Sequence, residues 1–180
     1  MAPYSIRVVG DPVLRQRAAE VTTIDGRLAK LAEDMLVTMY DAPGVGLAAP
    51  QVGVEKRMFV YDVGDGPRTV INPELVESRG EWTYEEGCLS VPGLSWDIVR
   101  PKEVLIRGID LDGNALEVEA DELLARCFQH EIDHLDGVLL LERLDPDTRR
   151  QALKTIRELG ISPSTLADAE PRATGLSFGK

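Results

Sequence analysis

Histidine, cysteine, aromatic residues and long apolar segments are all scarce in this chain of 180 residues. It contains two histidines and two cysteines, and aromatic residues make up 5% of it. Two cysteines behind a start that lacks a signal-type apolar core argue against a disulfide framework and predict a reducing cytoplasm. No apolar run approaches the roughly 20 residues that a membrane-spanning helix needs. We therefore expect a cytoplasmic protein with no membrane association.

Positive charge is also short relative to negative charge. The chain has 20 Lys and Arg residues against 31 Asp and Glu, which gives a formal net charge of −11 at pH 7. Direct DNA binding requires a basic face, so this balance argues against DNA as a partner. The length suits one folded domain with a sizeable core.

Both histidines lie in one pentapeptide, His130-Glu131-Ile132-Asp133-His134, which has the pattern H-E-x-x-H. Residues four apart lie on one face of a helix, so the two imidazoles can bind one divalent metal while Glu131 faces the same cavity. A bound metal acidifies a water molecule, and a neighbouring carboxylate can take and return its proton. Because histidine is so scarce here, a chance pair is a weak explanation, and the motif predicts a metal-dependent hydrolase.

A third protein ligand must be Cys, Asp or Glu, because no histidine remains. Cys127 would lie about 10 Å along the helix axis from His134. Ligands of one metal lie at most about 4.6 Å apart, so Cys127 is better interpreted as a core residue or pocket wall. Cys88 is the better candidate, because its glycine-bounded segment 86–93 can approach the helix from outside. Glu158 is the alternative, as in zinc peptidases with a downstream acid, but nothing around it supports that choice.

The rest of the chain predicts short helices and strands around the motif helix. Strand-like runs occupy residues 57–63, 69–71, 74–79, 104–110 and 116–120. Helices are expected after Asp11-Pro12, from Leu28 to about Tyr40, from the capping residue Asp121 to Gly137, and from Pro146 to about Leu159 behind the cap Asp145. The predicted fold class is α+β, with antiparallel strands packed around a central metal-binding helix that carries the H-E-x-x-H motif. Residues 1–160 are expected to form a single catalytic domain, and residues 161–180 a flexible C-terminal tail.

Three segments resemble, in order, the three motifs of the peptide deformylase family. They are Gly44-Val45-Gly46-Leu47-Ala48-Ala49-Pro50-Gln51-Val52-Gly53, Glu86-Gly87-Cys88-Leu89-Ser90 and Gln129-His130-Glu131-Ile132-Asp133-His134. The resemblance extends from Gly10 to about Leu144. Members of this family remove the formyl group from the N-terminal formylmethionine of nascent bacterial or organellar polypeptides and release formate. The resemblance therefore implies a metal-dependent amide hydrolase with a formyl-Met nascent peptide as its partner.

The same resemblance implies a set of metal ligands. Cys88, His130 and His134 match the family positions that bind one divalent ion per chain. Family members typically use Fe²⁺, with Zn²⁺, Ni²⁺ or Co²⁺ able to take its place. The sequence itself does not choose among them, since a Cys-His-His set suits several borderline metals.

The resemblance also assigns the catalytic groups. Glu131 is implied as general acid and base, and Gln51 and the backbone N–H of Leu89 as donors to the developing oxyanion. A neutral amide suits an oxyanion donor better than a ligand or a base. Taken alone, Gln51 is equally compatible with a turn after Pro50.

Substrate-binding positions follow from the motif offsets. Val45, Leu123 and Cys127 are implied as walls of the methionine pocket, with Gly46 and Gly87 beside the substrate. An extended peptide can pair its backbone with the edge at residues 44–46. Ordinary core packing is the alternative for each of the three apolar side chains.

Three further hypotheses concern the surroundings. Glu86 and Arg100 are interpreted either as a pair that steadies the cysteine segment or as a solvated surface pair. The last predicted helix carries Arg149, Arg150, Lys154 and Arg157, which we interpret as a solvated face balanced by Asp147 and Glu158. A transient contact of this helix with the ribosome is the alternative.

For the whole chain, a general metallopeptidase and a non-catalytic metal-stabilised binding module remain the rival functions.

Overall fold

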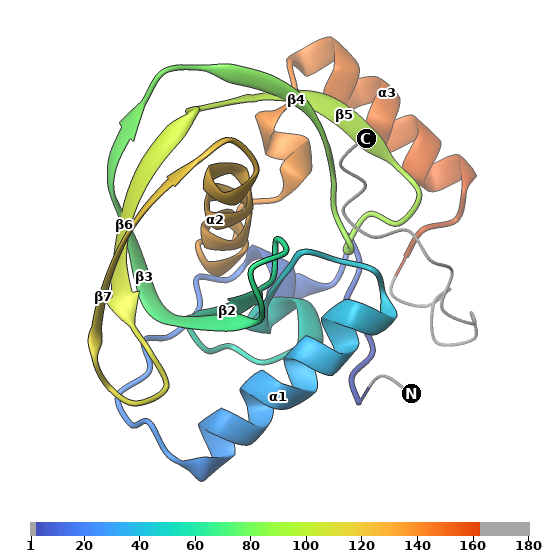
Figure 1. The fold of residues 1–180 in the computed structure, drawn as a ribbon. Helices are drawn as coiled ribbons and strands as arrows, with labels where there is room; N and C mark the ends of the chain where they lie inside the picture. The colour runs from blue at the N-terminus through green and yellow to red at the C-terminus, as the bar shows by residue number, and fades with distance from the viewer. Residues whose placement is uncertain (1–2, 163–180) are drawn as a thin grey trace.

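The computed structural model describes residues 3–162. Antiparallel strands curve around one central helix, α2 (Glu122–Leu135), with α1 (Gly26–Asp41) and α3 (Pro146–Glu158) outside the curve (Figure 1). Three short 3-10 helices are η1 (Pro12–Arg15), η2 (Ala49–Val52) and η3 (Leu140–Arg143). The strands are β1 (Gly46–Ala48), β2 (Met58–Tyr61), β3 (Arg68–Arg79), β4 (Trp82–Gly87), β5 (Ser95–Arg100), β6 (Glu103–Ile109) and β7 (Ala115–Asp121). The predicted α+β class is confirmed.

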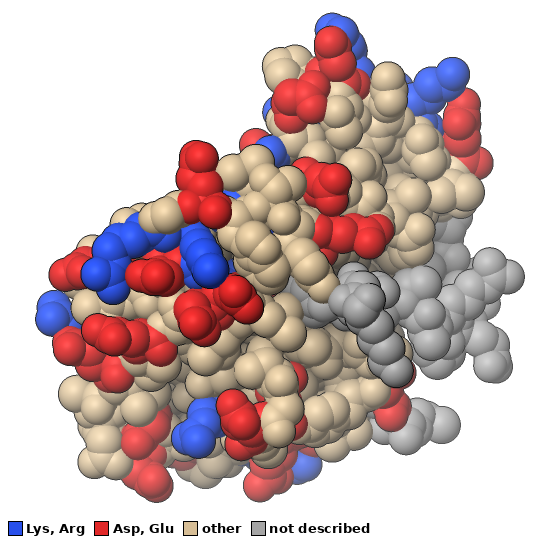
Figure 2. Space-filling view, turned by 45° about the horizontal axis from the view of Figure 1, so that its top comes forward, with Lys and Arg blue, Asp and Glu red and all other residues tan. Residues whose placement is uncertain are grey.

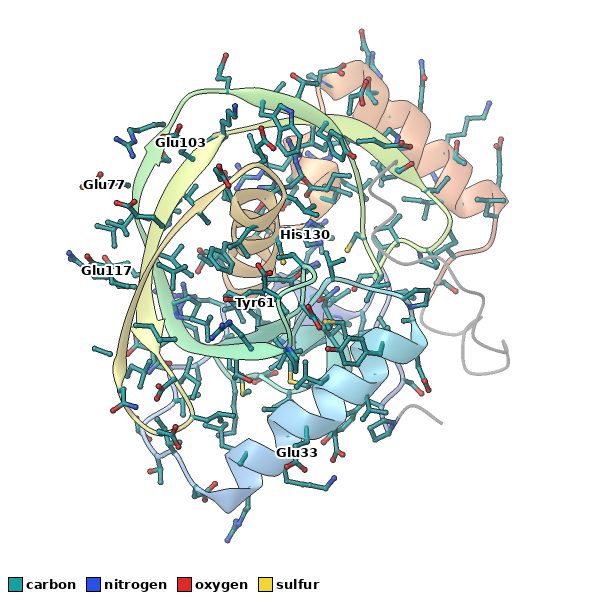
Figure 3. The ribbon with its side chains drawn as sticks, viewed as in Figure 1. Glu33, Tyr61, Glu77, Glu103, Glu117 and His130 are labelled. Atoms are coloured by element: carbon teal, nitrogen blue, oxygen red, sulfur yellow. The ribbon has the colours of Figure 1, made fainter. Side chains whose placement is uncertain are left out.

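Two sheets make up the strand layer. One has five strands in the order β1-β2-β3-β6-β7, and the other is the β4-β5 pair; all their pairings are antiparallel. Glu77, Glu103 and Glu117 project outward from the five-stranded sheet, whereas Tyr61 points inside (Figure 3). The sheet therefore has one solvent-exposed face and one face that packs on α2.

The strand β3 corrects the expectation of two separate strands at 69–71 and 74–79. It is one element of 12 residues, with a shift in register between Ile71 and Glu74. Asn72 adopts a φ of 49° there, and its side-chain amide accepts from the Val21 N–H at 2.8 Å and donates to the Val21 carbonyl at 2.9 Å. Asparagine tolerates this left-handed backbone, so the strand continues through the bulge.

The β4–β5 pair was not anticipated from the sequence. It joins six residue pairs, from Trp82 with Arg100 to Gly87 with Ser95. Its first four positions alternate between partly buried and exposed, but charged and hydroxyl side chains interrupt the apolar pattern. Pairing with a partner strand, rather than local alternation, holds these residues extended.

The start of α1 follows the expected rules. The Asp25 carboxylate accepts from the N–H groups of Arg27 and Leu28, both at 3.0 Å, which satisfies two of the free donors at the helix start. The apolar stripe then faces inward, and its four expected members are all buried: Leu28, Leu31, Met35 and Met39.

The start of α2 differs from expectation in one detail. Asp121 occupies the N-cap position but its side chain makes no capping hydrogen bond. Glu122 follows with a φ of 44° and donates its N–H to the Lys102 carbonyl, so β7 runs directly into the helix and leaves the aspartate outside the cap. The helix ends as predicted before Gly137, whose φ is 74°.

The core consists of three apolar clusters around α2. One lies between α2 and the five-stranded sheet, where the rings of Phe59, Tyr61 and Phe128 contact one another at 5.0 to 5.9 Å. A second joins α1 to β1 and β2. The third lies beneath α3, and Ile161 packs against it. The predicted tail starts at this residue; its positions 163–180 lie outside the described residues.

The surface carries charges of both signs. On the face shown in Figure 2, Lys and Arg side chains are interspersed with Asp and Glu rather than gathered into one basic area. Among residues 3–162, no helix is long and apolar enough to cross a membrane.

Candidate metal centre

Three potential metal ligands meet beside α2. The helix carries His130 and His134 one turn apart, and Cys88 follows directly after β4. The Cys88 Sγ lies 3.2 Å from the Nε2 of His134, which lies 3.2 Å from the Nε2 of His130. All three side chains are buried, and Figure 3 shows His130 extending from α2 inside the curve of the strands.

The donor set fits one divalent cation. Its three ligand atoms lie within 4.8 Å of one another, which is close to twice a metal–sulfur bond. Burial alone raises the pKa of a thiol, but His134 and His130 outweigh that effect and lower the pKa of Cys88 to about 5. A thiolate with two imidazole nitrogens suits zinc, iron and other borderline metals.

Glu131 is a buried carboxylate without a partner beside these donors. It is 1% exposed, and neither of its oxygens has a hydrogen-bond partner among the described residues. Burial, opposed by the two histidines, raises its pKa to about 7. A carboxyl group whose pKa lies near neutrality is suited to proton transfer.

Gly46 makes room for that carboxylate. A Cβ atom at this position would lie 2.4 Å from the Glu131 Oε1 and 2.9 Å from the Cys127 Sγ. No other residue type fits there without moving Glu131. The glycine lies in β1, at one edge of the five-stranded sheet.

The two predicted oxyanion donors lie on the cysteine side of the centre. Gln51, 1% exposed, accepts from the Ala48 N–H at 2.9 Å, so its Nε2 is directed at the Ser90 Oγ, 3.2 Å away, and the Cys88 Sγ, 3.9 Å away. The backbone N–H of Leu89 has no acceptor within the described part of the chain.

The predicted pocket residues occupy different surroundings. Cys127 is fully buried, its thiol donates to the Val45 carbonyl at 3.7 Å, and burial raises its pKa well above the ordinary value. It is not among the three donors that come together. Leu123 is half-buried on the first turn of α2, Val45 packs at the margin of the first cluster, and Gly87 ends β4.

Glu86 and Arg100 form a buried pair, which excludes the solvated alternative. The Arg100 guanidinium donates to both Glu86 oxygens at 2.7 and 2.8 Å, and the two side chains are 0% and 4% exposed. The Nδ1 of His130 lies 2.6 Å from the Glu86 Oε1. Burial opposes the charge on Glu86, but Arg100 and His130 hold its pKa well below the usual range. The ionised Glu86 therefore keeps the His130 proton on Nδ1 and leaves Nε2 free for a metal.

Sequence reasoning missed three polar residues in this neighbourhood. Arg126 is 1% exposed and donates to Glu86 at 2.7 Å. Asp133 accepts from Arg100 at 2.9 Å, and Ser90 donates its N–H to the Cys88 Sγ at 3.4 Å. The sequence held one signal, a lone arginine four residues before His130 within the apolar run of α2.

The opposite side of α2 borders a separate cavity of about 560 Å³. Gln129, Ile132 and Asp133 of α2 and its C-cap residue Asp136 line this cavity, and helical periodicity places them away from His130 and His134. None of the predicted site residues lines it. Glu158, the alternative third ligand, lies exposed at the end of α3 with Lys154 at 3.7 Å and does not join the donors.

Two imidazoles, a thiolate and a free buried carboxylate on one α+β scaffold define the class of candidate metal-dependent hydrolases. The chain matches the family description "Polypeptide deformylase" over residues 3–150. It is 54% identical over 145 residues to the peptide deformylase of Agathobacter rectalis, covering 81% of this chain and 92% of that protein. Against the Acidothermus cellulolyticus peptide deformylase it is 51% identical over 158 residues, with 88% of each chain covered.

A solved structure agrees with these relatives. The crystal structure of a peptide deformylase from Legionella pneumophila superposes with a TM-score of 0.84 at 40% identity, covering 93% of this chain and 99% of that one. The chain belongs to the polypeptide deformylase family, metal-dependent enzymes that remove the N-formyl group from nascent peptides. The resemblance in sequence motifs is thereby confirmed.

Proposed function

We propose that this chain removes the formyl group from N-terminal formylmethionine through the centre built by Cys88, His130, His134 and Glu131. One observation carries the proposal: three buried donors within 4.8 Å adjoin a buried carboxylate that has no partner among the described residues. A closed structural metal site has no need of such a carboxylate.

Cys88, His130 and His134 are proposed to hold one divalent cation. When bound there, it supplies a Lewis acid for the formyl oxygen and lowers the pKa of the attacking water. Fe²⁺ is proposed on the family resemblance, with Zn²⁺, Ni²⁺ and Co²⁺ as alternatives. Metal analysis of protein purified without oxygen tests this assignment, and a protein that contains no transition metal would contradict it.

The remaining catalytic roles fall to three residues. Glu131 takes the proton of the attacking water and returns it to the departing amine, so that formate and a free N-terminus result. As negative charge develops on the formyl oxygen, Gln51 Nε2 and the Leu89 N–H donate to it. Two observations support these roles: the orientation of the Gln51 amide, and a Leu89 N–H that has no acceptor among residues 3–162.

The substrate is proposed to lie along β1. Two glycines allow close approach of an extended backbone: Gly46, at the sheet edge, and Gly87, the residue before Cys88. Val45, Leu123 and Cys127 are proposed as walls of the methionine pocket. Burial of Cys127 against the Val45 carbonyl is equally compatible with plain core packing.

A direct assay separates the rival functions. Formate release from a formyl-Met peptide is expected, with no cleavage of the same peptide without the formyl group. Cleavage of internal bonds would instead indicate a general metallopeptidase. Peptide binding without formate release would indicate a binding module.

We further propose that this deformylase acts in the cytoplasm as one catalytic domain.

A contact between α3 and the ribosome is a separate hypothesis. It is motivated by the substrates of the family, which are nascent peptides. Ion pairs of Arg150 with Asp147 and of Lys154 with Glu158 favour the solvated interpretation of α3. Reversing the charges of Arg149, Arg150, Lys154 and Arg157 tests the contact. Equal co-sedimentation of this variant and the parent with ribosomes at low salt would rule it out.

A further inference from the structure

Arg126 is a fully buried cation next to the candidate metal centre. It lies on α2 four residues before His130, so the two side chains share one face of the helix. Its side chain is 1% exposed and is among the largest that the core encloses. Arginine is almost never buried unless it is paired, so this position calls for an explanation.

Its partners are Glu86 and two aromatic rings. Arg126 Nη1 donates to the Glu86 Oε2 at 2.7 Å, and Nη2 donates to the Trp82 carbonyl at 2.7 Å. The guanidinium lies over the Trp82 ring at 5.0 Å and the Tyr84 ring at 5.9 Å, and these two rings stack on each other. Strand β4 therefore supplies all of these contacts, from its alternate residues Trp82, Tyr84 and Glu86.

Glu86 is thereby fixed by donors from two other elements, β5 and α2. Its Oε1 accepts from Arg100 of β5 and from His130 Nδ1 of α2, and its Oε2 accepts from Arg100 and from Arg126. Arg100 is also bound at 2.9 Å to Asp133, which Arg143 contacts in turn. Arg100 therefore divides its donors between Glu86 and Asp133, whereas Arg126 donates to Glu86 and to the Trp82 carbonyl.

Burying this cation costs solvation free energy, and close packing of the core does not require a charged side chain here. An apolar side chain of similar volume can often replace a buried charge without loss of stability. The Nε of Arg126 even lacks a hydrogen-bond partner among the described residues. What an apolar residue cannot supply is the second donor to the Glu86 Oε2.

We propose that Arg126 is a positioning residue of the metal centre, which fixes Glu86 against the Nδ1–H of His130 and so directs the His130 Nε2 at the cation. This inference rests on the proposed metal ligands. Residues that orient a ligating histidine change metal affinity by about 10–100-fold when they are replaced. Arg126 acts through Glu86 and His130 and does not touch the reacting atoms.

The test measures metal affinity rather than activity. Arg126→Met removes the donors at similar volume, and Arg126→Lys keeps the charge and a donor. Competition for Zn²⁺ with a chromophoric chelator gives the dissociation constant of each folded variant. We expect Arg126→Met to bind about 10–100-fold more weakly than the parent, and Arg126→Lys to recover part of that loss. The Co²⁺-loaded proteins should also differ in their visible absorption bands, which report ligand geometry.

Arg57 provides the matched control. It too is buried, pairs with Asp136 at 2.7 Å and contacts the end of α2, but it does not touch Glu86. Arg57→Gln is expected to lower the thermal midpoint while the Zn²⁺ dissociation constant stays at the parent value.

The outcomes separate the inference from the proposed function. Equal dissociation constants for parent and Arg126→Met would overturn the positioning role while leaving the metal site intact. An equal loss of affinity in Arg57→Gln would overturn it too, because the effect would then reflect general destabilisation. A parent that binds no metal would overturn the proposed function itself. If Arg126→Met does not fold, Arg126→Gln, which keeps a donor without the charge, replaces it and is expected to bind Zn²⁺ more weakly than Arg126→Lys.

Discussion

At the scale of single residues, the chemistry of this protein depends on which buried groups have partners. Glu86 accepts four hydrogen bonds, whereas the two Glu131 oxygens accept none from the described residues. Both carboxyl groups are nearly inaccessible to solvent. The first is therefore held in one ionised state, and the second is free to exchange a proton.

Replacing Glu131 by Gln should retain metal and lose nearly all deformylation. An amide of the same shape cannot accept the proton of the attacking water, and removal of a positioned general base costs about 10²–10⁴ in rate. Formate release by metal-loaded enzyme measures the effect. Glu158→Gln, at an exposed pair on α3, is the control and should match the parent. A metal-loaded Glu131→Gln with parental turnover would refute the assigned mechanism.

The two cysteines should respond differently to substitution by alanine. Cys88→Ala removes one of the three clustered donors and is expected to abolish tight metal binding. Cys127→Ala removes a thiol from the apolar core, so metal is expected to remain while stability or methionine affinity falls. Metal content after gel filtration distinguishes them. Parental metal content in Cys88→Ala would refute the ligand set.

Gly46→Ala tests the close approach of β1 to Glu131. The added Cβ would lie 2.4 Å from the Glu131 Oε1, so the carboxylate or the strand must shift. We expect a loss of about 1–3 kcal/mol in the free energy of unfolding, as for other overpacked sites, together with reduced formate release. Gly26→Ala is the control, because nothing lies within 4 Å of a Cβ there. Similar results for the two variants would contradict this account.

At the scale of elements, the helix starts depend on specific side-chain acceptors. Asp25 accepts two backbone N–H groups at the start of α1, whereas Asp121 accepts none at the start of α2. Asp25→Ala is therefore expected to destabilise the protein by about 1 kcal/mol, and Asp121→Ala by much less. Chemical denaturation of both variants checks this, and equal losses would show that capping is not the cause.

The strands show why local patterns predict some elements and miss others. The residues of β6 and β7 alternate or run apolar around the Asp110–Asn114 turn, and both strands lie where the pattern predicts them. β4 carries Glu85, Glu86 and Gly87, which no local rule assigns to a strand. Its partner β5 and the buried arginines that bind Glu86 hold it in place.

At the scale of the whole molecule, the catalytic unit and the C-terminal region should be separable. All proposed site residues lie between Val45 and His134, and the family match ends at residue 150. Ile161, however, packs against the cluster beneath α3. A chain ending after Ser162 is expected to deformylate short formyl-Met peptides at the parental rate. A variant ending after Gly160 should be less stable, because it loses the Ile161 contact. A large fall in activity in the first variant would place a site residue in the deleted segment.

The sequence by itself determined the features that depend on short spacings. His130 and His134 share a helix face because they are four residues apart, and Glu131 lies three residues before His134. Asp25 caps α1 because its carboxylate reaches the N–H groups two and three residues further on. The rise of a helix places Cys127 too far along the axis from His134 for its short side chain to share a metal with it. The sequence therefore already favoured Cys88 over Cys127 as the third donor. The roles of these residues in catalysis stay predictions.

Tertiary structure alone decided the surroundings of the donors. Arg126 and Glu86 are 40 positions apart, and Asn72 and Val21 are 51 positions apart. Neither pairing leaves a periodic trace in the sequence, because each depends on how β4 and the β3 bulge are placed by other strands. Whether an arginine lies in solvent or next to a candidate metal-ligating histidine is settled only when the sheets close around α2.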